Sequence, residues 1–389
     1  MAGKKKSVKS KKKGEVKLTE RKKSNIYEQI KELQHEISTT KYNKATQGAI
    51  GLLKAKLAML KERATQRASV GKASGDTRFS VRKTGDATVI LLGFPSVGKS
   101  TLLNKLTNAK SEIAKYAFTT LSAVPGLLNY KFAKIQIIDV PGIVSGAASG
   151  KGRGKEVIAM LRSADLILIL VDALAPEHYK AILNEVYQSG IRINQQKPDV
   201  KITKKEKGGI TIGTTTRLTK IDHTIITSIA KEMKLNNADI LIREDIDDGQ
   251  LIDCITGDKI YTKALAVITK IDLIDKPTFE KIKKQIKPDL VVSAEKEYNI
   301  GKLKDAIYNK MGFIRIFLKE ANKKADMEEP LIMTKGSTIH DVCNKLHRDF
   351  IDKFKFARLW GPSAKFDGQV FRKLNKGLAD KDILELHMR

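Results

Sequence analysis

Cysteine is scarce in this 389-residue chain, tryptophan occurs once, and no long apolar run is present. The two cysteines, Cys254 and Cys343, stand far apart in the sequence, which excludes a disulfide scaffold and fits a reducing cytoplasm. The longest apolar run, Leu166–Val171, is too short to cross a bilayer. The lysine-rich start has no apolar segment after it, so we expect no secretory signal. These absences predict a cytoplasmic protein that does not enter a membrane.

Acidic residues are also outnumbered, since 73 Lys and Arg stand against 44 Asp and Glu and give a formal net charge of +29. This excess favours a polyanionic partner such as RNA, DNA or an anionic membrane surface. Lysine dominates the first thirteen positions, a segment with nothing to bury that we expect to be disordered. Such a cluster binds phosphate backbones by releasing counterions, although a solubilising tail would have the same composition.

Two helical stripes follow this basic tail, which we place at residues 1–20. Apolar residues repeat at steps of three and four in each stripe, and the short polar stretch between them predicts a helical hairpin. Glycines and polar residues from Gly71 to Gly85 then mark a boundary. We therefore predict an N-terminal helical domain at residues 21–85. The stripe residues are Ile26, Ile30, Leu33 and Ile37, then Ile50, Leu53, Leu57, Leu60 and Ala64.

A buried-strand run, Ala87–Leu92, leads directly into a glycine-rich loop and then into a helix. This is the P-loop pattern in its required strand–loop–helix context. Its glycines let backbone N–H groups close around phosphate oxygens, and the helix N-terminus adds positive potential. Lys99 is placed to reach the β and γ phosphates, and the Ser100 hydroxyl to ligate Mg²⁺. The predicted nucleotide-binding residues here are Gly93, Phe94, Pro95, Ser96, Val97, Gly98, Lys99, Ser100 and Thr101.

A second strand, Ile135–Ile138, ends in an acidic residue that is soon followed by glycine. This order suits a carboxylate that contacts the hydration shell of Mg²⁺ and a backbone N–H that faces the γ-phosphate. Between the two motifs lies a candidate switch I segment, whose Thr120 would complete the Mg²⁺ shell when the γ-phosphate is present. We expect Lys99, Thr120 and Gly142 to carry catalysis. The predicted nucleotide-binding residues of these segments are Phe118, Thr119, Thr120, Asp139, Pro141 and Gly142.

Base recognition is predicted at the end of another buried strand, Leu265–Ile268, which leads into Thr269, Lys270 and Asp272. The Asp272 carboxylate can accept two hydrogen bonds from guanine N1–H and the exocyclic amine, whereas adenine would leave it unpaired. Lys270 can lie flat along the base. A later strand, Leu290–Val292, ends in Ser293 and Ala294, placed to contact the guanine carbonyl oxygen through a backbone N–H. The predicted nucleotide is GTP.

The distance between two strands predicts an inserted domain. Leu166–Val171 and Leu265–Ile268 should be neighbouring parallel strands, yet far more than the roughly 30 residues of a βαβ unit separate them. We expect the insertion at residues 177–262, with strands near Ile210–Ile212 and Ile240–Ile242 and a helix at Thr224–Lys234 between them. The G domain then occupies residues 86–176 and 263–313.

Residues 314–389 are compatible with a small β-grasp fold, because they hold several short strand candidates and one predicted helix, Ile339–Phe350. A last G-domain helix is expected before them, near Lys302–Met311. Basic residues crowd near the Ile339–Phe350 helix, and either a solvated face or a face that docks RNA or protein would explain them. These basic residues are Lys345, Arg348, Lys353, Lys355 and Arg358.

Taken together, the P-loop, the switch motifs and a glycine-rich stretch from Gly146 to Gly154 resemble the Obg superfamily of GTPases. Four further segments are similar to its developmentally regulated GTP-binding (DRG) subfamily, and the likeness covers nearly all of the chain beyond the first twenty residues. It implies an α/β P-loop GTPase domain with a mainly parallel sheet, an N-terminal helical hairpin, an inserted small α/β domain and a C-terminal TGS domain, with a role on ribosomes. The four segments are Tyr42–Thr46, Gly51–Leu57, Lys207–Ile210 and Trp360–Pro362.

The sequence departs from the usual GTPase pattern at three positions. Thr269 stands where most of these GTPases have the Asn that ties the base site to the P-loop, so we expect weaker nucleotide affinity. Ile143 follows Gly142, where small regulatory GTPases carry a water-orienting glutamine, so water must be positioned by other groups. Ser96 stands where some relatives use Asn to hold a monovalent cation. Whether K⁺ acts as a second cofactor beside Mg²⁺ therefore stays open.

We therefore predict a slow GTPase that acts as a nucleotide-dependent switch on ribosomes. Its expected partners are GTP and GDP, the ribosome or rRNA, and a regulatory protein. We expect the protein to be a monomer. An Obg-like P-loop ATPase is an alternative that Asp272 disfavours. A metabolic kinase is disfavoured by the Asp139–Gly142 switch pattern. An RNA-binding structural protein with a degenerate nucleotide site is disfavoured by the intact Lys99, Ser100 and Asp139.

Overall fold

The chain contains two compact units, of which the first combines Met1–Gly75 with Gln196–Lys259 and the second combines Asp76–Gln195 with Ile260–Arg389. The structure, a computed structural model, describes residues 26–41, 43, 46–69, 85–107, 124–140, 154–321, 323–347 and 349–389. The lysine-rich segment at residues 1–20 lies outside the described residues, as does most of the Gly71–Gly85 boundary. Within the described residues, no helix is long and apolar enough to span a membrane.

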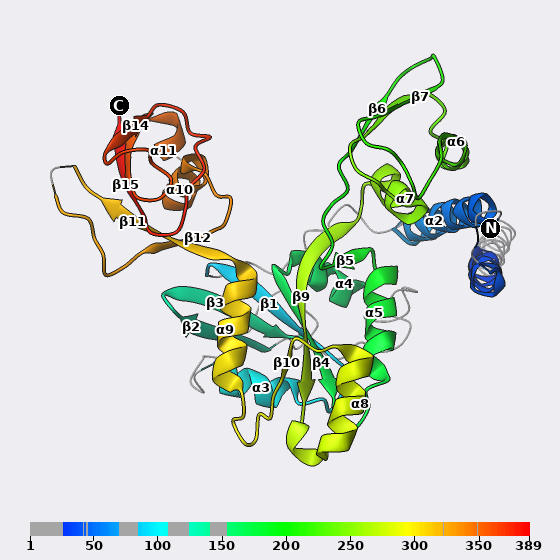
Figure 1. Ribbon diagram of the computed structural model, residues 1–389, viewed down its shortest axis with the longest axis horizontal. Helices are drawn as coiled ribbons and strands as arrows, with labels where there is room; N and C mark the ends of the chain where they lie inside the picture. Colours follow the sequence, from blue (N-terminus) through cyan, green and yellow to red (C-terminus); the bar gives the residue numbers. More distant parts are fainter. Residues whose placement is uncertain are drawn as a thin grey trace, which may run out of the picture. The chain divides into compact units, whose positions relative to one another are not determined.

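The second unit is built on a seven-stranded sheet in the order β10-β9-β4-β1-β3-β2, with β5 pairing β9 (Figure 1). Every pairing is parallel except that of β2 with β3. Two of the strands, β1 and β4, are buried on both faces, which explains why their sequences read as continuous apolar runs. The strands are β1 Ala87–Leu92, β2 Val124–Tyr130, β3 Ala133–Asp139, β4 Leu166–Asp172, β5 Ile191–Ile193, β9 Ile260–Thr269 and β10 Leu290–Val291.

Helices cover both faces of this sheet. On one face, apolar residues of α3 (Lys99–Leu106) and α9 (Ile300–Met311) share a core with β1, β3 and β4. On the other face, α4 (Gly154–Ser163), α5 (His178–Gln188) and α8 (Lys276–Ile286) form a second core. The predicted α/β P-loop fold with a mainly parallel sheet is therefore confirmed, as is the predicted parallel pairing of Leu166–Val171 with Leu265–Ile268.

The C-terminal part of the chain forms a five-stranded sheet in the order β12-β11-β15-β13-β14. Its strands are β11 Phe313–Lys319, β12 Leu331–Thr334, β13 Phe354–Trp360, β14 Gln369–Phe371 and β15 Asp382–Met388. One face packs on α10 (Ile339–Leu346), where fully buried Val342 and Cys343 meet Leu359 and Leu384. A sheet covered by one main helix is the arrangement expected for a β-grasp domain.

The helix predicted over Ile339–Phe350 is wrong in its extent. It ends at Leu346, because His347 adopts extended backbone with φ −163° and ψ 142°. A separate short helix, α11 (Asp349–Asp352), follows, and its Phe350 and Ile351 both pack against the core. The break at His347 changes the direction of the chain, and α11 then places Phe350 and Ile351 against the same core as α10.

The first unit joins the N-terminal helical segment to the inserted segment. Residues 26–39 and α2 (Gln47–Ser69) are helical, as predicted. The inserted segment forms a three-stranded sheet in the order β6-β8-β7, in which β8 is antiparallel to β6 and parallel to β7. Its elements are β6 Val200–Lys204, β7 Ile210–Thr214, α6 His223–Glu232, β8 Ala238–Ile242 and α7 Asp248–Thr256. The strands and the helix predicted there are confirmed.

Helix α2 packs on α6 and α7 through a small-residue face. Ala55 is fully buried in the core of the inserted segment. A Cβ at Gly51 would lie 3.2 Å from Ile229 Cδ1, so glycine permits this close approach. Lys54 adds an ion pair of 2.8 Å to Asp248, at the start of α7. The buried face of α2 therefore includes Gly51 and Ala55, which lie next to the apolar stripe predicted from the sequence.

Candidate functional site

The P-loop lies between β1 and α3, and its backbone requires small or tolerant residues. A Cβ at Gly93 would meet Leu170 O at 2.8 Å and Val97 Cγ1 at 2.9 Å, so only glycine fits there. Ser96 and Gly98 adopt left-handed backbone conformations with φ of 63° and 91°. A loop of this shape turns its backbone N–H groups inward. The loop therefore has the form that phosphate binding requires.

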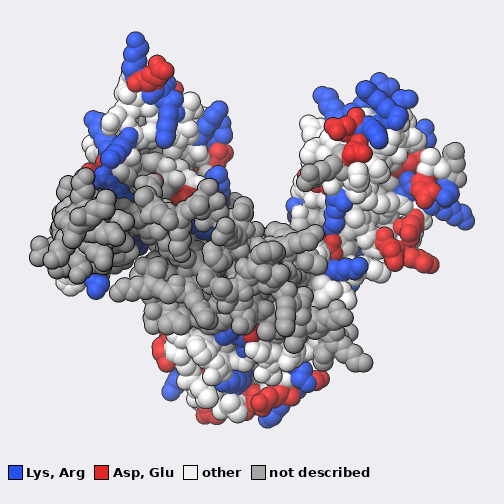
Figure 2. Space-filling view, turned by 180° about the vertical axis from the view of Figure 1, so that it is seen from behind, with Lys and Arg blue, Asp and Glu red and all other residues white. Residues whose placement is uncertain are grey.

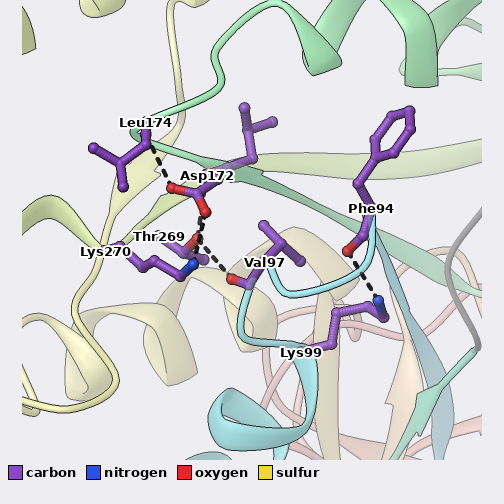
Figure 3. A network of polar contacts seen from close by, with 8 residues as sticks. Phe94, Val97, Lys99, Asp172, Leu174, Thr269 and Lys270 are labelled. Atoms are coloured by element: carbon purple, nitrogen blue, oxygen red, sulfur yellow. Dashed lines mark hydrogen bonds and ion pairs between the residues drawn. The ribbon is translucent and has the colours of Figure 1, made fainter.

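Lys99 is held inside this loop. Its ammonium donates to the carbonyl oxygens of Gly93 and Phe94, each at 3.2 Å (Figure 3). The side chain is only 9% exposed, and this burial lowers the pKa of Lys99, while the nearby Asp139 carboxylate acts in the opposite direction. The lysine is thus oriented by backbone carbonyls, which leaves its position in the loop fixed by the protein itself.

Ser100 and Asp139 provide a site that fits Mg²⁺. The Ser100 hydroxyl donates to Asp139 Oδ2 at 2.7 Å. Asp139 Oδ1 is buried and has no hydrogen-bond partner among the described residues, a state that is costly unless another group satisfies it. The described residues contain no cluster of three or more His, Cys, Asp or Glu that could hold a metal. This donor set matches Mg²⁺ that is bound through one hydroxyl, waters and phosphate oxygens.

Several predicted site residues lie outside the described residues, so their roles remain predictions. They belong to the switch I candidate and to the segment that follows Asp139. The residues are Phe118, Thr119, Thr120, Pro141, Gly142 and Ile143.

Thr269 ties the base-recognition strand to the P-loop. Its hydroxyl donates to Val97 O at 2.9 Å and lies 3.3 Å from Val171 O (Figure 3). The side chain is buried, so the hydrogen bond is shielded from water. This threonine therefore supplies a contact that Asn makes in most related GTPases.

Replacing Thr269 with valine tests that link. Valine keeps the shape but removes the donor, which leaves Val97 O unpaired and should cost about 1–3 kcal/mol of stability. We also expect weaker GDP binding, because the P-loop loses a tie to the base site. Thr107→Val is the matched control, since Thr107 is buried and its hydroxyl bonds only Leu103 O within α3. Thermal unfolding and GDP titration of both variants measure this; equal effects on GDP affinity would contradict the assignment.

The ionised form of Asp272 is favoured by the Ser293 side chain. The Ser293 hydroxyl is the main reason why the pKa of Asp272 lies below its ordinary value. Ser293 is almost fully buried, and its hydroxyl oxygen also accepts from the backbone N–H of Lys296 at 3.1 Å. Asp272 itself is half-exposed in a short 3₁₀ turn, Ile271–Leu273. Its carboxylate is thus held ionised while remaining accessible to a base.

Of the two residues predicted to contact the guanine carbonyl, the structure favours Ala294. The Ser293 N–H already donates to Tyr298 O at 3.2 Å. The Ala294 N–H has no protein acceptor in the described part of the chain. The Ala294 N–H is therefore the one of the two that is available for the predicted contact.

Asp172 belongs to this site although the sequence reasoning did not include it. It ends β4, beside Thr269 on β9. Its Oδ2 lies 2.7 Å from Lys270 Nζ, and its Oδ1 accepts from the Leu174 N–H at 2.9 Å (Figure 3). The sequence did contain a sign of this role, because Asp172 is an acidic residue at the end of a buried strand, β4. Parallel strands bring their carboxyl ends together, so the end of β4 lies beside the end of β9.

Family comparisons match the whole G-domain and C-terminal region. A family described as 50S ribosome-binding GTPase matches residues 88–205, a family described as the C-terminal region of that domain matches residues 207–313, and the TGS domain family matches residues 314–388. A solved structure of the FeoB G-domain from Methanococcus jannaschii is 19% identical, with a TM-score of 0.32 over 58% of this chain and 98% of that chain.

Full-length relatives are more similar. An uncharacterised GTP-binding protein of Methanocaldococcus jannaschii is 51% identical over 93% of this chain and 92% of its own length. A developmentally regulated GTP-binding protein 1 homologue of Dictyostelium discoideum is 42% identical over 93% of this chain and 99% of its own. Together with the P-loop, the Ser100–Asp139 pair and the base motif, these similarities show that the chain belongs to the developmentally regulated GTP-binding protein family.

Proposed function

We propose that this GTP-binding protein hydrolyses GTP slowly and acts as a nucleotide-dependent switch on the ribosome. The observation that supports the proposal is a set of hydrogen bonds that joins the P-loop to the Asp139 strand and to the base motif. Lys99 is held by the P-loop backbone, Ser100 is paired with Asp139, and Thr269 ties the base motif to Val97. Such preorganisation is what phosphoryl transfer requires, since its catalysis is mainly positioning and charge stabilisation.

In this proposal, Lys99 stabilises charge on the β and γ phosphates, and the Gly142 N–H and the Thr120 hydroxyl order the γ-phosphate. Mg²⁺, held by Ser100 and Thr120 and supported by Asp139, would neutralise phosphate charge when bound. Loss of the γ-phosphate would release Thr120 and the segment after Gly142, which changes the surface offered to a partner. K⁺ remains a candidate second cofactor, with Ser96 at the position that would contact it.

A ribosomal partner is supported by charge. The chain carries a formal net charge of +29, and its family match includes a domain described as ribosome-binding. In the C-terminal domain, Figure 2 shows Lys and Arg side chains gathered at one end. Lys353, Lys355 and Arg358 are exposed in this domain, whereas Lys345 forms a 2.6 Å ion pair with Asp86. We propose RNA contacts by the exposed group, in a cytoplasmic monomer. The proposed domain boundaries are those predicted from the sequence, except that the insertion is limited to residues 196–259, because α5 and β5 belong to the second unit.

Removing residues 1–20 should weaken ribosome binding and flatten its salt dependence. Each lost phosphate contact reduces the slope of log K against log salt by about 0.7–0.9, and the deleted arm is rich in lysine. Cosedimentation with ribosomes over a salt series measures the contribution of residues 1–20 to binding. The same experiment with a GTP analogue and with GDP measures how binding depends on the nucleotide. A full-length variant with the arm lysines changed to glutamine separates charge from length. An unchanged slope would make the arm a solubilising tail, and equal binding with both nucleotides would contradict the switch.

The two alternatives make different demands on the base site. An Obg-like ATPase would have to accept adenine, yet Asp272 is held ionised by Ser293 and presents acceptors that guanine, and not adenine, can satisfy. An RNA-binding protein with a degenerate site would not need the Thr269–Val97 hydrogen bond or the Ser100–Asp139 hydrogen bond. Competition of ATP and GTP for the purified protein separates these functions directly.

A further inference from the structure

The Asp172 carboxylate is fixed by two contacts that use both of its oxygens. One oxygen forms the 2.7 Å ion pair with Lys270, and the other accepts the Leu174 N–H in a tight turn after β4. The Asp172 side chain is 16% exposed and that of Lys270 is 34% exposed, so the pair is partly shielded. A partly buried carboxylate locked at both oxygens is a fixed anchor, unlike a mobile surface ion pair.

The backbone at Lys270 carries strain that the surrounding contacts maintain. Lys270 has φ 56° and ψ 36°, the left-handed region, which costs a non-glycine residue about 1 kcal/mol or more. The residue before it is tied on both sides, by the Thr269 hydroxyl to Val97 O and by the Ala173 N–H to Thr269 O at 3.1 Å. Strain that is held this firmly is concentrated at functional sites. The conformation sends the Lys270 side chain toward Asp172 (Figure 3).

We propose that Asp172 is a positioning residue for nucleotide binding, which anchors the Lys270 ammonium so that the aliphatic stem of the lysine faces the guanine plane. Two carboxylates then have separate tasks. Asp272, half-exposed at the end of the base strand in the Ile271–Leu273 turn, reads the base edge, and Asp172 neutralises the lysine so that its ammonium does not compete with guanine for Asp272. This inference rests on the proposed guanine site and adds to it the residue that sets the lysine.

The Asp172→Asn variant is expected to bind GDP and GTP about tenfold more weakly, because a charge-assisted contact is lost. In single-turnover hydrolysis, the rate at saturating GTP should stay near that of the unchanged protein, while the GTP concentration for half-maximal rate rises. Asp305→Asn is the matched control, since Asp305 forms an ion pair of the same 2.7 Å length with Lys131 on an exposed surface of the G domain. It should leave nucleotide affinity unchanged.

A double-mutant cycle separates positioning from general destabilisation. Once Lys270→Ala has removed the ammonium, Asp172→Asn should cause no further loss of GDP affinity, whereas independent effects would add. Thermal unfolding of each nucleotide-free variant shows whether the fold persists. If Asp172→Asn does not stay folded, Lys270→Met replaces it: a retained stem should preserve more affinity than Lys270→Ala.

The outcomes distinguish this inference from the guanine site itself. Wild-type affinity in Asp172→Asn, or additive losses in the cycle, would overturn the role of Asp172 while leaving guanine preference intact. Equal affinities of Lys270→Met and Lys270→Ala would overturn it as well. Equal affinity of the unchanged protein for GTP and ATP would instead overturn the guanine site, independently of the role of Asp172.

Discussion

Replacing Lys99 with alanine is expected to reduce single-turnover GTP hydrolysis by about 10²–10³-fold, the cost of removing one preorganised group that stabilises developing charge. The structure explains why other groups should not compensate. Lys99 is buried and is held by Gly93 O and Phe94 O, so its charge is placed before the nucleotide arrives. Burial lowers the pKa of Lys99, while the nearby Asp139 carboxylate acts in the opposite direction.

The unchanged protein should already be slow, below about 1 s⁻¹, the low end of typical enzymes. Ile143 cannot orient water or stabilise charge, so Ile143→Ala should change basal turnover little and serves as the control beside Lys99→Ala. Thr120→Ala should reduce turnover sharply. Adding ribosomes should accelerate hydrolysis by ordering the switch segments. A large loss from Ile143→Ala would show that its aliphatic side chain positions water, against this account.

Changing Asp272 to asparagine is expected to weaken GTP binding by about 10²–10⁴-fold, since two hydrogen bonds to a charged acceptor are lost. The same change should favour xanthosine triphosphate, because an amide can donate to the xanthine C2 carbonyl and still accept from N1–H. Competition binding with the three nucleotides GTP, ATP and xanthosine triphosphate measures the switch in preference.

The pKa of Asp272 sets the pH range of that test. Because the Ser293 hydroxyl lowers this pKa, Asp272 becomes protonated at a lower pH than an ordinary aspartate. Guanine preference should therefore persist as the pH falls from neutral to about 5 and weaken only in stronger acid. A preference lost near neutral pH would mean that another group reads the base, as would comparable affinity of the unchanged protein for ATP and GTP.

Local sequence patterns were sufficient to predict an element where one physical cause determines its structure. The apolar runs of β1 and β4 reflect burial on both faces of a parallel sheet, and the P-loop reflects its own backbone requirements, so both were predictable. The end of α10 was not, because the apolar residues Phe350 and Ile351 after the break at His347 pack on a core formed by distant strands, and their spacing alone suggests a continuous helix.

Contacts between distant segments were the second limit. The sequence identified Thr269 as a departure, but only the structure shows its hydroxyl at Val97 O. Asp172 was missed because an acidic residue at a strand end is common, and its meaning comes from the position of Lys270 on the neighbouring strand. The packing of α2 on α6 and α7 was hidden for the same reason, since periodicity describes a helix face and not the partner that covers it.

That packing has a consequence for how the chain is made. Lys54 on α2 and its ion-pair partner Asp248 are separated by 194 positions. At roughly 5–20 residues per second, a translating ribosome reaches the partner segment roughly 10–40 s after α2 is synthesised. Throughout this interval the Ala55 face of α2 has no native surface to cover it, and it must avoid other apolar chains. Helix α2 is thus made early but is covered only after α7 has been synthesised, and the length of the segment between them sets the duration of its exposure.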